Sequence, residues 1–131
     1  MMHEHKVKVR FNETDGLGHV SNISYFIYLE DARIELLRDL RASMQMDGWS
    51  YIVASVKCDY KQQAYFDDQL IVESAIEKIG FTSFKIAHKI TNERGVIAIG
   101  EVTMVHFDFN KQASIPLQEQ MRSRLKQFME S

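Results

Sequence analysis

The chain has 131 residues, 45% of them hydrophobic and only one a proline, which suits a single domain over residues 1–131 with a packed core. Its 16 basic and 18 acidic residues give a formal charge of −2 without a basic cluster, which argues against nucleic acid as a partner. No segment approaches the roughly 20 apolar residues that cross a bilayer, and the N-terminus lacks the apolar run of a signal peptide, so we expect a cytoplasmic protein without a membrane partner.

The first third of the chain predicts a strand, a loop and a long helix. Alternating polar and apolar residues over 6–11 indicate the strand, and the turn-rich stretch NETDGLG follows it. From Asn22 to about Met44, apolar side chains recur with helical spacing over a broad arc. The arc consists of Ile23, Phe26, Ile27, Leu29, Ala32, Ile34, Leu36, Leu37 and Leu40. Because it is wider than a surface helix needs, we expect other elements to wrap this helix.

The rest of the chain predicts four strands and a closing helix. Residues 51–64, 70–79, 81–90 and 96–109 have the composition or alternation of strands, with a hairpin turn between the last two. Pro116 can start the last helix, whose apolar stripe comprises Leu117, Met121, Leu125 and Phe128. We therefore expect an α+β fold in which a five-stranded antiparallel sheet wraps around a long central helix, with a C-terminal helix outside it. A ferredoxin-like fold would need a second central helix, and none is predicted.

Several polar side chains fall on apolar faces. Glu30 and Arg33, three residues apart within the helical arc, are expected to form a structural or interface ion pair, with a role in the site as the alternative. His88 and His106 are interpreted as hydrogen-bonded core histidines. Cys58 is the only cysteine and cannot form an internal disulfide, so we expect a packed, inert thiol.

The stretch around Asp15 is the strongest candidate for chemistry. Gly16 and Gly18 allow unusual backbone conformations and close approach of a ligand, and Ser21 or Asn22 is a favoured helix cap. The first amides of the helix would then be free at its positive end, where they can polarise a carbonyl and hold an oxyanion. A carboxylate just upstream can attack that carbonyl or activate a water, which indicates acyl transfer to water. The alternative is an ordinary polar turn.

Other catalytic patterns are absent from the sequence. There is no G-x-S-x-G motif for a serine nucleophile and no glycine-rich phosphate loop. The HEH triplet at residues 3–5 lacks the H-E-x-x-H spacing of a zinc site. We therefore expect neither a metal nor another cofactor.

The segment ETDGLGHVSNISYFIYLEDAR, residues 13–33, resembles the hotdog-fold acyl-CoA thioesterases of the 4-hydroxybenzoyl-CoA thioesterase type. Like the sequences of that family, it contains in this order T-D, a glycine, H-V, an asparagine, a tyrosine and E-x-A-R. AYFDDQLIVES at 64–74, IGFTSFKIAHKI at 79–90 and SIP at 114–116 fall where similar proteins have a turn into the third strand, a polar strand and the start of the last helix. The resemblance thus extends over nearly the whole chain.

The resemblance implies hydrolysis of an acyl-CoA thioester to CoA and a carboxylic acid. It assigns Asp15 as nucleophile or general base, and the helix-start amide at Asn22 as the group that polarises the thioester carbonyl. His19 and Tyr25 match positions lining the acyl end of the site, although packing or fixing the loop is an equal alternative for each.

Thr82 and Ser83 match a strand that runs beside the pantetheine and nucleotide of CoA in similar enzymes. Some hydroxybenzoyl enzymes have basic residues just before that serine, where this chain has GFT, so the phosphate contacts must come from elsewhere. The candidates are Lys57, Lys61, Lys78 and Lys85. The departure also weakens transfer of the aromatic substrate, and the acyl group and the choice between CoA and acyl-carrier protein stay open.

Hotdog domains of this type pair their sheets edge to edge, with the site between two subunits. The resemblance therefore implies a homodimer or a homotetramer built from two dimers, and residues 96–109 are predicted to form the long strand left exposed at the edge of a monomer. Two other functions remain as alternatives: a binding module that holds an acyl ligand without turnover, and a hydratase or dehydratase that uses His19 near Asp15.

Overall fold

The computed structural model describes residues 2–129. It has a helix α1 (Asn22–Asp39), a short helix α2 (Glu119–Lys126) and six strands. The strands are β1 (His3–Lys8), β2 (Tyr51–Tyr60), β3 (Gln69–Ile79), β4 (Ser83–Asn92), β5 (Gly95–Asp108) and β6 (Ala113–Ser114). All expected elements are present, although β1 lies three residues earlier than the expected 6–11, α1 ends five residues before Met44 and α2 begins at Glu119 instead of Pro116.

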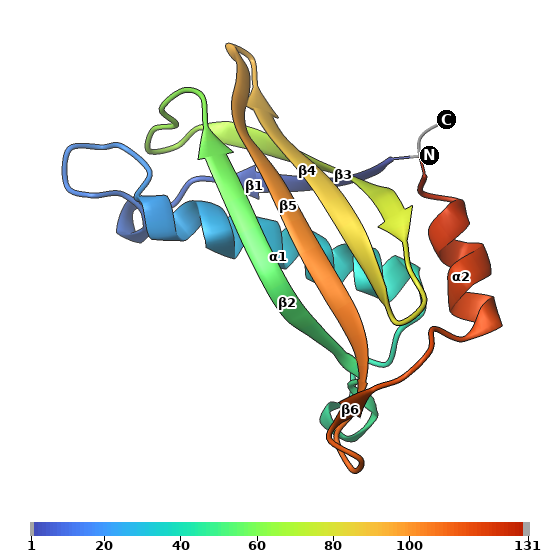
Figure 1. Ribbon diagram of the computed structural model, residues 1–131. Helices are drawn as coiled ribbons and strands as arrows, with labels where there is room; N and C mark the ends of the chain where they lie inside the picture. The colour runs from blue at the N-terminus through green and yellow to red at the C-terminus, as the bar shows by residue number, and fades with distance from the viewer. Residues whose placement is uncertain (1, 130–131) are drawn as a thin grey trace.

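One antiparallel sheet wraps around α1. The strand order is β1-β3-β4-β5-β2, and β6 adds a two-residue pairing to the end of β5. Figure 1 shows α1 crossing one face of this curved sheet and α2 standing beside its far end. The expected α+β hotdog architecture is confirmed, with the short β6 as an addition.

Two apolar clusters hold α1 in the sheet. Tyr28 and Leu29 pack with residues of β3, β4 and β5 near the start of the helix, whereas Leu36 and Leu37 pack with Phe84 and neighbours near its end. The stripe of α2 joins the second cluster, with Leu117, Met121, Leu125 and Phe128 all buried. The rotation of α1 is fixed because Leu29 lies so close to Gly100 that a Cβ atom there would be 2.7 Å from its Cδ1.

The expectation that residues 96–109 form the exposed edge is wrong. β5 lies inside the sheet between β4 and β2, and β2 is an edge strand. Alternation in a sequence tells which face of a strand is apolar, but not which strands are its neighbours. Among the exposed apolar side chains, Val53 and Val56 lie on β2, and Ile23, Phe26 and Ile27 lie on α1.

Both histidines expected in the core are there. His88 is 2% exposed, and its Nδ1 lies 2.7 Å from the hydroxyl oxygen of Ser74, while His106 Nδ1 lies 2.9 Å from the carbonyl oxygen of Pro116. The expected pair of Arg33 with Glu30 is also present at 3.4 Å, with Arg33 buried and Glu30 exposed. The polar row of Ser74 and His88 separates the two apolar clusters beneath α1.

His88 predicts a pH dependence of stability. Burial, followed by the charges of Arg33 and His3, lowers the pKa of His88 to about 3. An unfolded histidine binds a proton below about pH 6.5 whereas native His88 stays neutral, so the free energy of unfolding should fall as the pH drops from there toward 3, by at most about 1.4 kcal/mol per pH unit from this group. Urea unfolding of the wild type and of His88→Gln measures this. The variant should lose that part of the slope, a control His5→Gln should keep it, and parallel curves for wild type and His88→Gln would contradict the assignment.

Candidate active site

Asp15 lies on a tight hairpin between β1 and α1. Thr14 pairs with Val20 in an isolated bridge, and the Asp15 amide donates to the carbonyl of His19 at 2.9 Å. Gly16 and Gly18 occupy the tip with φ angles of 87° and 85°, which other residues adopt only with strain. Figure 1 shows this loop, coloured blue, protruding at one end of the sheet.

The carboxylate of Asp15 is exposed at this tip. Its Oδ1 accepts a hydrogen bond from the Leu17 amide at 3.0 Å, which is the local contact that the polar-turn interpretation expects. Within residues 2–129, Oδ2 contacts no donor. One oxygen is therefore available for an external group while the other fixes the side chain.

The start of α1 offers free amides. Ser21 is the N-cap residue, and its hydroxyl contacts the Ser24 hydroxyl at 2.9 Å instead of a backbone amide. The Ser21 amide donates to the carbonyl of Glu13, and the Ser24 amide donates to the carbonyl of Ser21. In the described part of the chain, no acceptor meets the amides of Asn22 and Ile23. These two donors are therefore free at the positive end of the helix.

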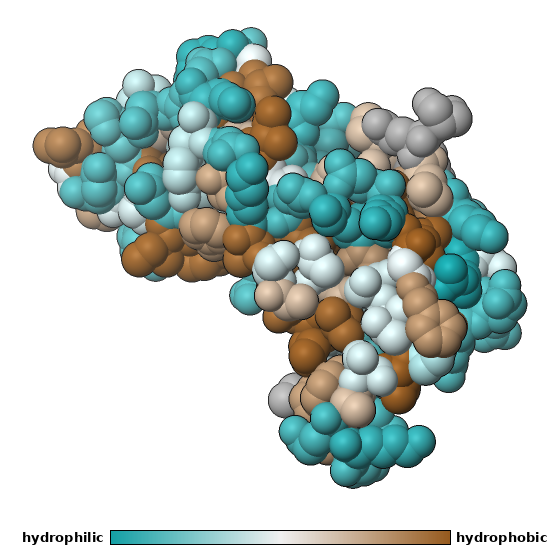
Figure 2. Space-filling view, viewed as in Figure 1, coloured by the Kyte–Doolittle hydropathy of each residue, from teal (hydrophilic) through white to brown (hydrophobic). Residues whose placement is uncertain are grey.

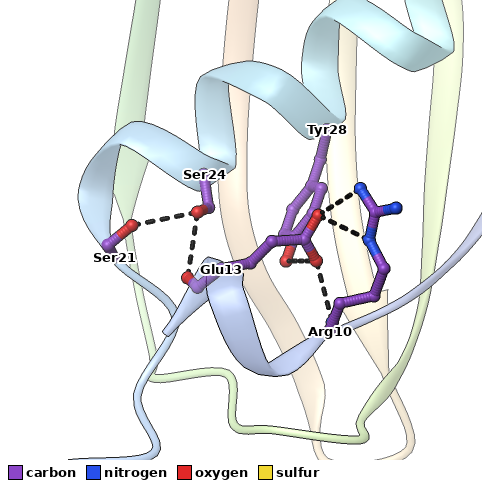
Figure 3. Close-up of polar contacts among 5 residues, drawn as sticks. All are labelled: Arg10, Glu13, Ser21, Ser24 and Tyr28. Atoms are coloured by element: carbon purple, nitrogen blue, oxygen red, sulfur yellow. Dashed lines mark hydrogen bonds and ion pairs between the residues drawn. The ribbon is translucent and has the colours of Figure 1, made fainter. Parts of the chain in front are cut away.

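A buried carboxylate that the sequence analysis did not single out connects the hairpin to α1 (Figure 3). Glu13 is 7% exposed, and its carboxylate accepts hydrogen bonds from the Arg10 amide at 2.8 Å, the Arg10 guanidinium at 3.0 and 3.2 Å, and the Tyr28 hydroxyl at 3.0 Å. Its carbonyl also accepts the Ser24 hydroxyl at 2.9 Å. The i,i+3 spacing of Arg10 and Glu13 was the only signal for this cluster in the sequence.

Opposing effects act on the pKa of Glu13. Burial raises it, but the hydrogen bonds from Arg10 and Tyr28 and the Arg10 charge outweigh burial, so the pKa lies below its ordinary value. Burial and the neighbouring Glu13 carboxylate in turn raise the pKa of Tyr28. Glu13 is therefore ionised and Tyr28 is neutral at physiological pH.

His19 and Tyr25 lie at the same end as Asp15 and contact the segment after β2. The His19 ring packs edge-on against Tyr65 with centroids 5.2 Å apart, and the two residues pair through a backbone bridge. Tyr25 is 2% exposed, and its hydroxyl accepts the Ala64 amide at 3.1 Å. Tyr60 completes the contact, because its hydroxyl donates to the carbonyl of Asn22 at 3.3 Å.

Thr82 and Ser83 lie at the opposite end of the sheet. Ser83 pairs with Val105 at one end of β4, whereas Ile90, which belongs to the cluster around Tyr25, pairs with Ala98 near the other end. At about 3.3 Å per residue, Ser83 and Ile90 are on the order of 20 Å apart. Figure 1 shows the two ends: the blue loop at the left and the turn between β3 and β4 at the right. A single chain therefore does not bring Asp15 and Ser83 together.

A cavity of about 320 Å³ opens beside Ser83. Its lining includes Lys78 and Lys85, two of the four lysines considered for phosphate contacts. The Lys85 ammonium is already paired with Glu101 at 2.8 Å, whereas Lys78 has no ion pair within residues 2–129.

Residues 2–129 contain no group of three or more His, Cys, Asp and Glu side chains placed to hold a metal ion. Cys58 is partly buried, and burial together with the Asp59 charge raises the pKa of its thiol, which favours the unreactive form. No helix of the described chain is long and apolar enough to span a membrane.

Comparison with known proteins places this geometry in a family. The model of the thioesterase-like superfamily matches residues 9–125. Long-chain acyl-CoA thioesterase FadM of Escherichia coli is 27% identical over 128 residues, covering 95% of this chain and 97% of FadM. Among solved structures, a predicted thioesterase from Bacillus stearothermophilus superposes with a TM-score of 0.94 and 27% identity, covering 100% of this chain and 98% of that one.

A thioesterase from Thermus thermophilus, solved with coenzyme A and Zn, superposes with a TM-score of 0.85 and 27% identity, covering 95% of this chain and 92% of that one. These findings confirm the expected fold and the general chemistry of thioester hydrolysis. The chain belongs to the thioesterase-like superfamily.

Proposed function

We propose that this chain hydrolyses acyl-CoA thioesters to CoA and a carboxylic acid, with Asp15 as nucleophile or general base. One observation carries the proposal: an exposed carboxylate and two free helix-start amides lie on the same short hairpin and helix junction. The named activity of FadM and the coenzyme A bound to the Thermus enzyme support CoA as the thiol.

The free amides act on the carbonyl oxygen of the thioester. The amide of Asn22, supported by that of Ile23 and by the helix dipole, polarises the carbonyl and stabilises the oxyanion that forms when its carbon is attacked. Hydrogen bonds to this oxygen strengthen as negative charge develops on it, so the amides lower the barrier as well as bind the substrate.

Asp15 supplies the second half of the reaction. As a nucleophile, its free oxygen bonds to the carbonyl carbon, the C–S bond breaks, the CoA thiolate leaves and takes a proton from water, and a second water hydrolyses the anhydride. As a general base, it takes a proton from a water that attacks the same carbon; the C–S bond then breaks and the departing CoA thiolate takes up that proton. Both routes need only Asp15, water and the amides.

The complete site requires a second copy of the chain. β2 runs from Tyr51, opposite His106 at the Ser83 end, to Tyr60, which contacts Asn22 at the Asp15 end. Antiparallel pairing of two β2 edges would therefore bring Thr82 and Ser83 of the partner subunit toward Asp15. The exposed apolar residues of β2 and α1 suit such a contact, and Figure 2 shows hydrophobic surface along the margin where these two elements meet.

His19 and Tyr25 support this site from within the chain. His19 fixes the hairpin through Tyr65, and Tyr25 fixes the segment that follows β2 through Ala64. Within residues 2–129 the His19 ring packs against Tyr65 and has no hydrogen bond or ion pair with a carboxylate, so this chain gives no support to a hydratase or dehydratase. Lys78, which lies beside Ser83 and has no ion pair within residues 2–129, is a better candidate than Lys85 to contact the CoA phosphates. Lys85 is already paired with Glu101.

Removing the charge of Asp15 tests the chemistry. Asp15→Asn keeps the size and the acceptor for the Leu17 amide but cannot attack or take a proton, so kcat for thiol release from acyl-CoA should fall at least about 100-fold. A matched control is Asp67→Asn, which changes an exposed aspartate paired with Lys8 on a nearby turn and should leave kcat unchanged. A panel of chain lengths with a thiol reagent measures both. Equal rates for wild type and Asp15→Asn would remove Asp15 from the mechanism, and saturable binding without thiol release by the wild type would favour a binding module.

Charging the β2 edge tests the assembly. Val56→Lys places a cation on the side of β2 that faces α1, where Val56 is 43% exposed, so the dimer should dissociate and activity should fall with it. Ile99→Lys is the control, because Ile99 is 44% exposed but points to the opposite face of the sheet. Sedimentation velocity measures the oligomeric state and separates dimer from tetramer. Activity assays over a range of protein concentrations show whether activity falls as the oligomer dissociates. A fully active wild-type monomer would contradict the shared site.

A further inference from the structure

We infer that Glu13 is a positioning residue of this site, which holds the Asp15 hairpin against the start of α1 so that the carboxylate and the free amides face one substrate. The inference rests on the proposed function of Asp15. Glu13 itself is buried and does not touch the substrate.

The side chain of Glu13 joins three segments of the chain. Arg10 follows β1, Glu13 ends a 3₁₀ helix over Phe11–Glu13, and Tyr28 lies in the second turn of α1. The carboxylate accepts hydrogen bonds from both neighbours, as Figure 3 shows. It is the only buried carboxylate in residues 2–129. Burying a charge is costly unless it is paired and hydrogen-bonded, so breaking this cluster should disturb the junction strongly.

The carbonyl of Glu13 ties the start of α1 to the hairpin. It accepts the Ser21 amide at 3.0 Å and the Ser24 hydroxyl at 2.9 Å. Since the Ser21 amide is bonded to Glu13 and the Ser24 amide to the Ser21 carbonyl, the amides of Asn22 and Ile23 between them are the ones left for a ligand in the described chain. Glu13 thus acts on the amides through its main chain and on the hairpin through its side chain.

The short separation in sequence couples the position of Glu13 closely to that of Asp15. Asp15 is two residues after Glu13, and Asn22 directly follows Ser21, whose amide is held by Glu13. Two residues span at most about 7 Å, so the backbone of Asp15 cannot move far from the amides while this contact persists. Conversely, a displacement of Glu13 would also displace Asp15. A displacement of about 1 Å at a catalytic group can lower a rate about 100-fold.

The variant Glu13→Gln tests the inference with little change in shape. Its amide group would face the donors of Arg10 or Tyr28, while the main-chain carbonyl is retained. We expect kcat to fall about tenfold or more with KM nearly unchanged, because the loss affects placement of Asp15 and not affinity for CoA. Glu35→Gln is the control, since it removes a carboxylate paired with Arg38 on the exposed side of α1, and its kcat should match the wild type.

A double-mutant cycle separates positioning from a general loss of stability. If Glu13 acts through Asp15, adding Glu13→Gln to Asp15→Asn should change the residual kcat by less than about twofold. Multiplicative losses, or a wild-type kcat in folded Glu13→Gln, would overturn the inference. Should Glu13→Gln fail to fold, Tyr28→Phe, which keeps the Arg10 ion pair, should lower kcat about threefold and show the same non-additivity, and multiplicative loss there would equally overturn the inference. If Asp15→Asn is as active as wild type, the proposed function fails instead, whatever Glu13 does.

Discussion

The structure depends on the burial of α1 within the concave face of one sheet. Leu29 against Gly100 and the clusters on either side of the Ser74–His88 row fix the rotation and depth of the helix. The C-terminal half of α1 is covered by the cluster that includes α2, whereas its first residue, Asn22, contacts Tyr60 of the edge strand β2. Free amides at the start of α1 follow from the packing, because a helix start has donors without intrahelical acceptors.

The hairpin before α1 places an exposed carboxylate close in sequence to these amides. Glu13 satisfies some of the available donors and is itself satisfied by Arg10 and Tyr28, so the buried charge is fully hydrogen-bonded. Asp15 remains exposed beyond this anchored residue. An exposed carboxylate next to an anchored segment is the arrangement expected of a preorganised site, which is the role we propose for Asp15. Ser83, which we propose contacts CoA, lies at the opposite end of the sheet, so the proposal gives the exposed edge of β2 a role in completing the site.

The sequence predicted what depends on local pattern. Apolar alternation found the strands, and the wide arc of α1 predicted a wrapped helix and hence the hotdog architecture. The predictions failed where the outcome depends on which elements lie side by side in the fold. β5 was expected at the edge of the sheet, a position that β2 occupies. The exposure of Ile23, Phe26 and Ile27 could not be foreseen from helical spacing. Asp15 could be proposed from the sequence because the glycines and the helix cap beside it are adjacent in sequence. Glu13 was missed because its partners include Tyr28, which lies 15 residues away and is brought near only by the hairpin.

A crystal structure of Asp15→Asn with an intact acyl-CoA would show whether the thioester binds between residue 15 and the start of α1. We expect the thioester carbonyl oxygen within about 2.7–3.1 Å of the amide nitrogen of Asn22 or Ile23, and the side chain of residue 15 within about 3–3.5 Å of the carbonyl carbon. We also expect the pantetheine to pass toward Ser83 of the partner subunit. A thioester bound away from the start of α1, with residue 15 pointing into solvent, would contradict the proposed mechanism.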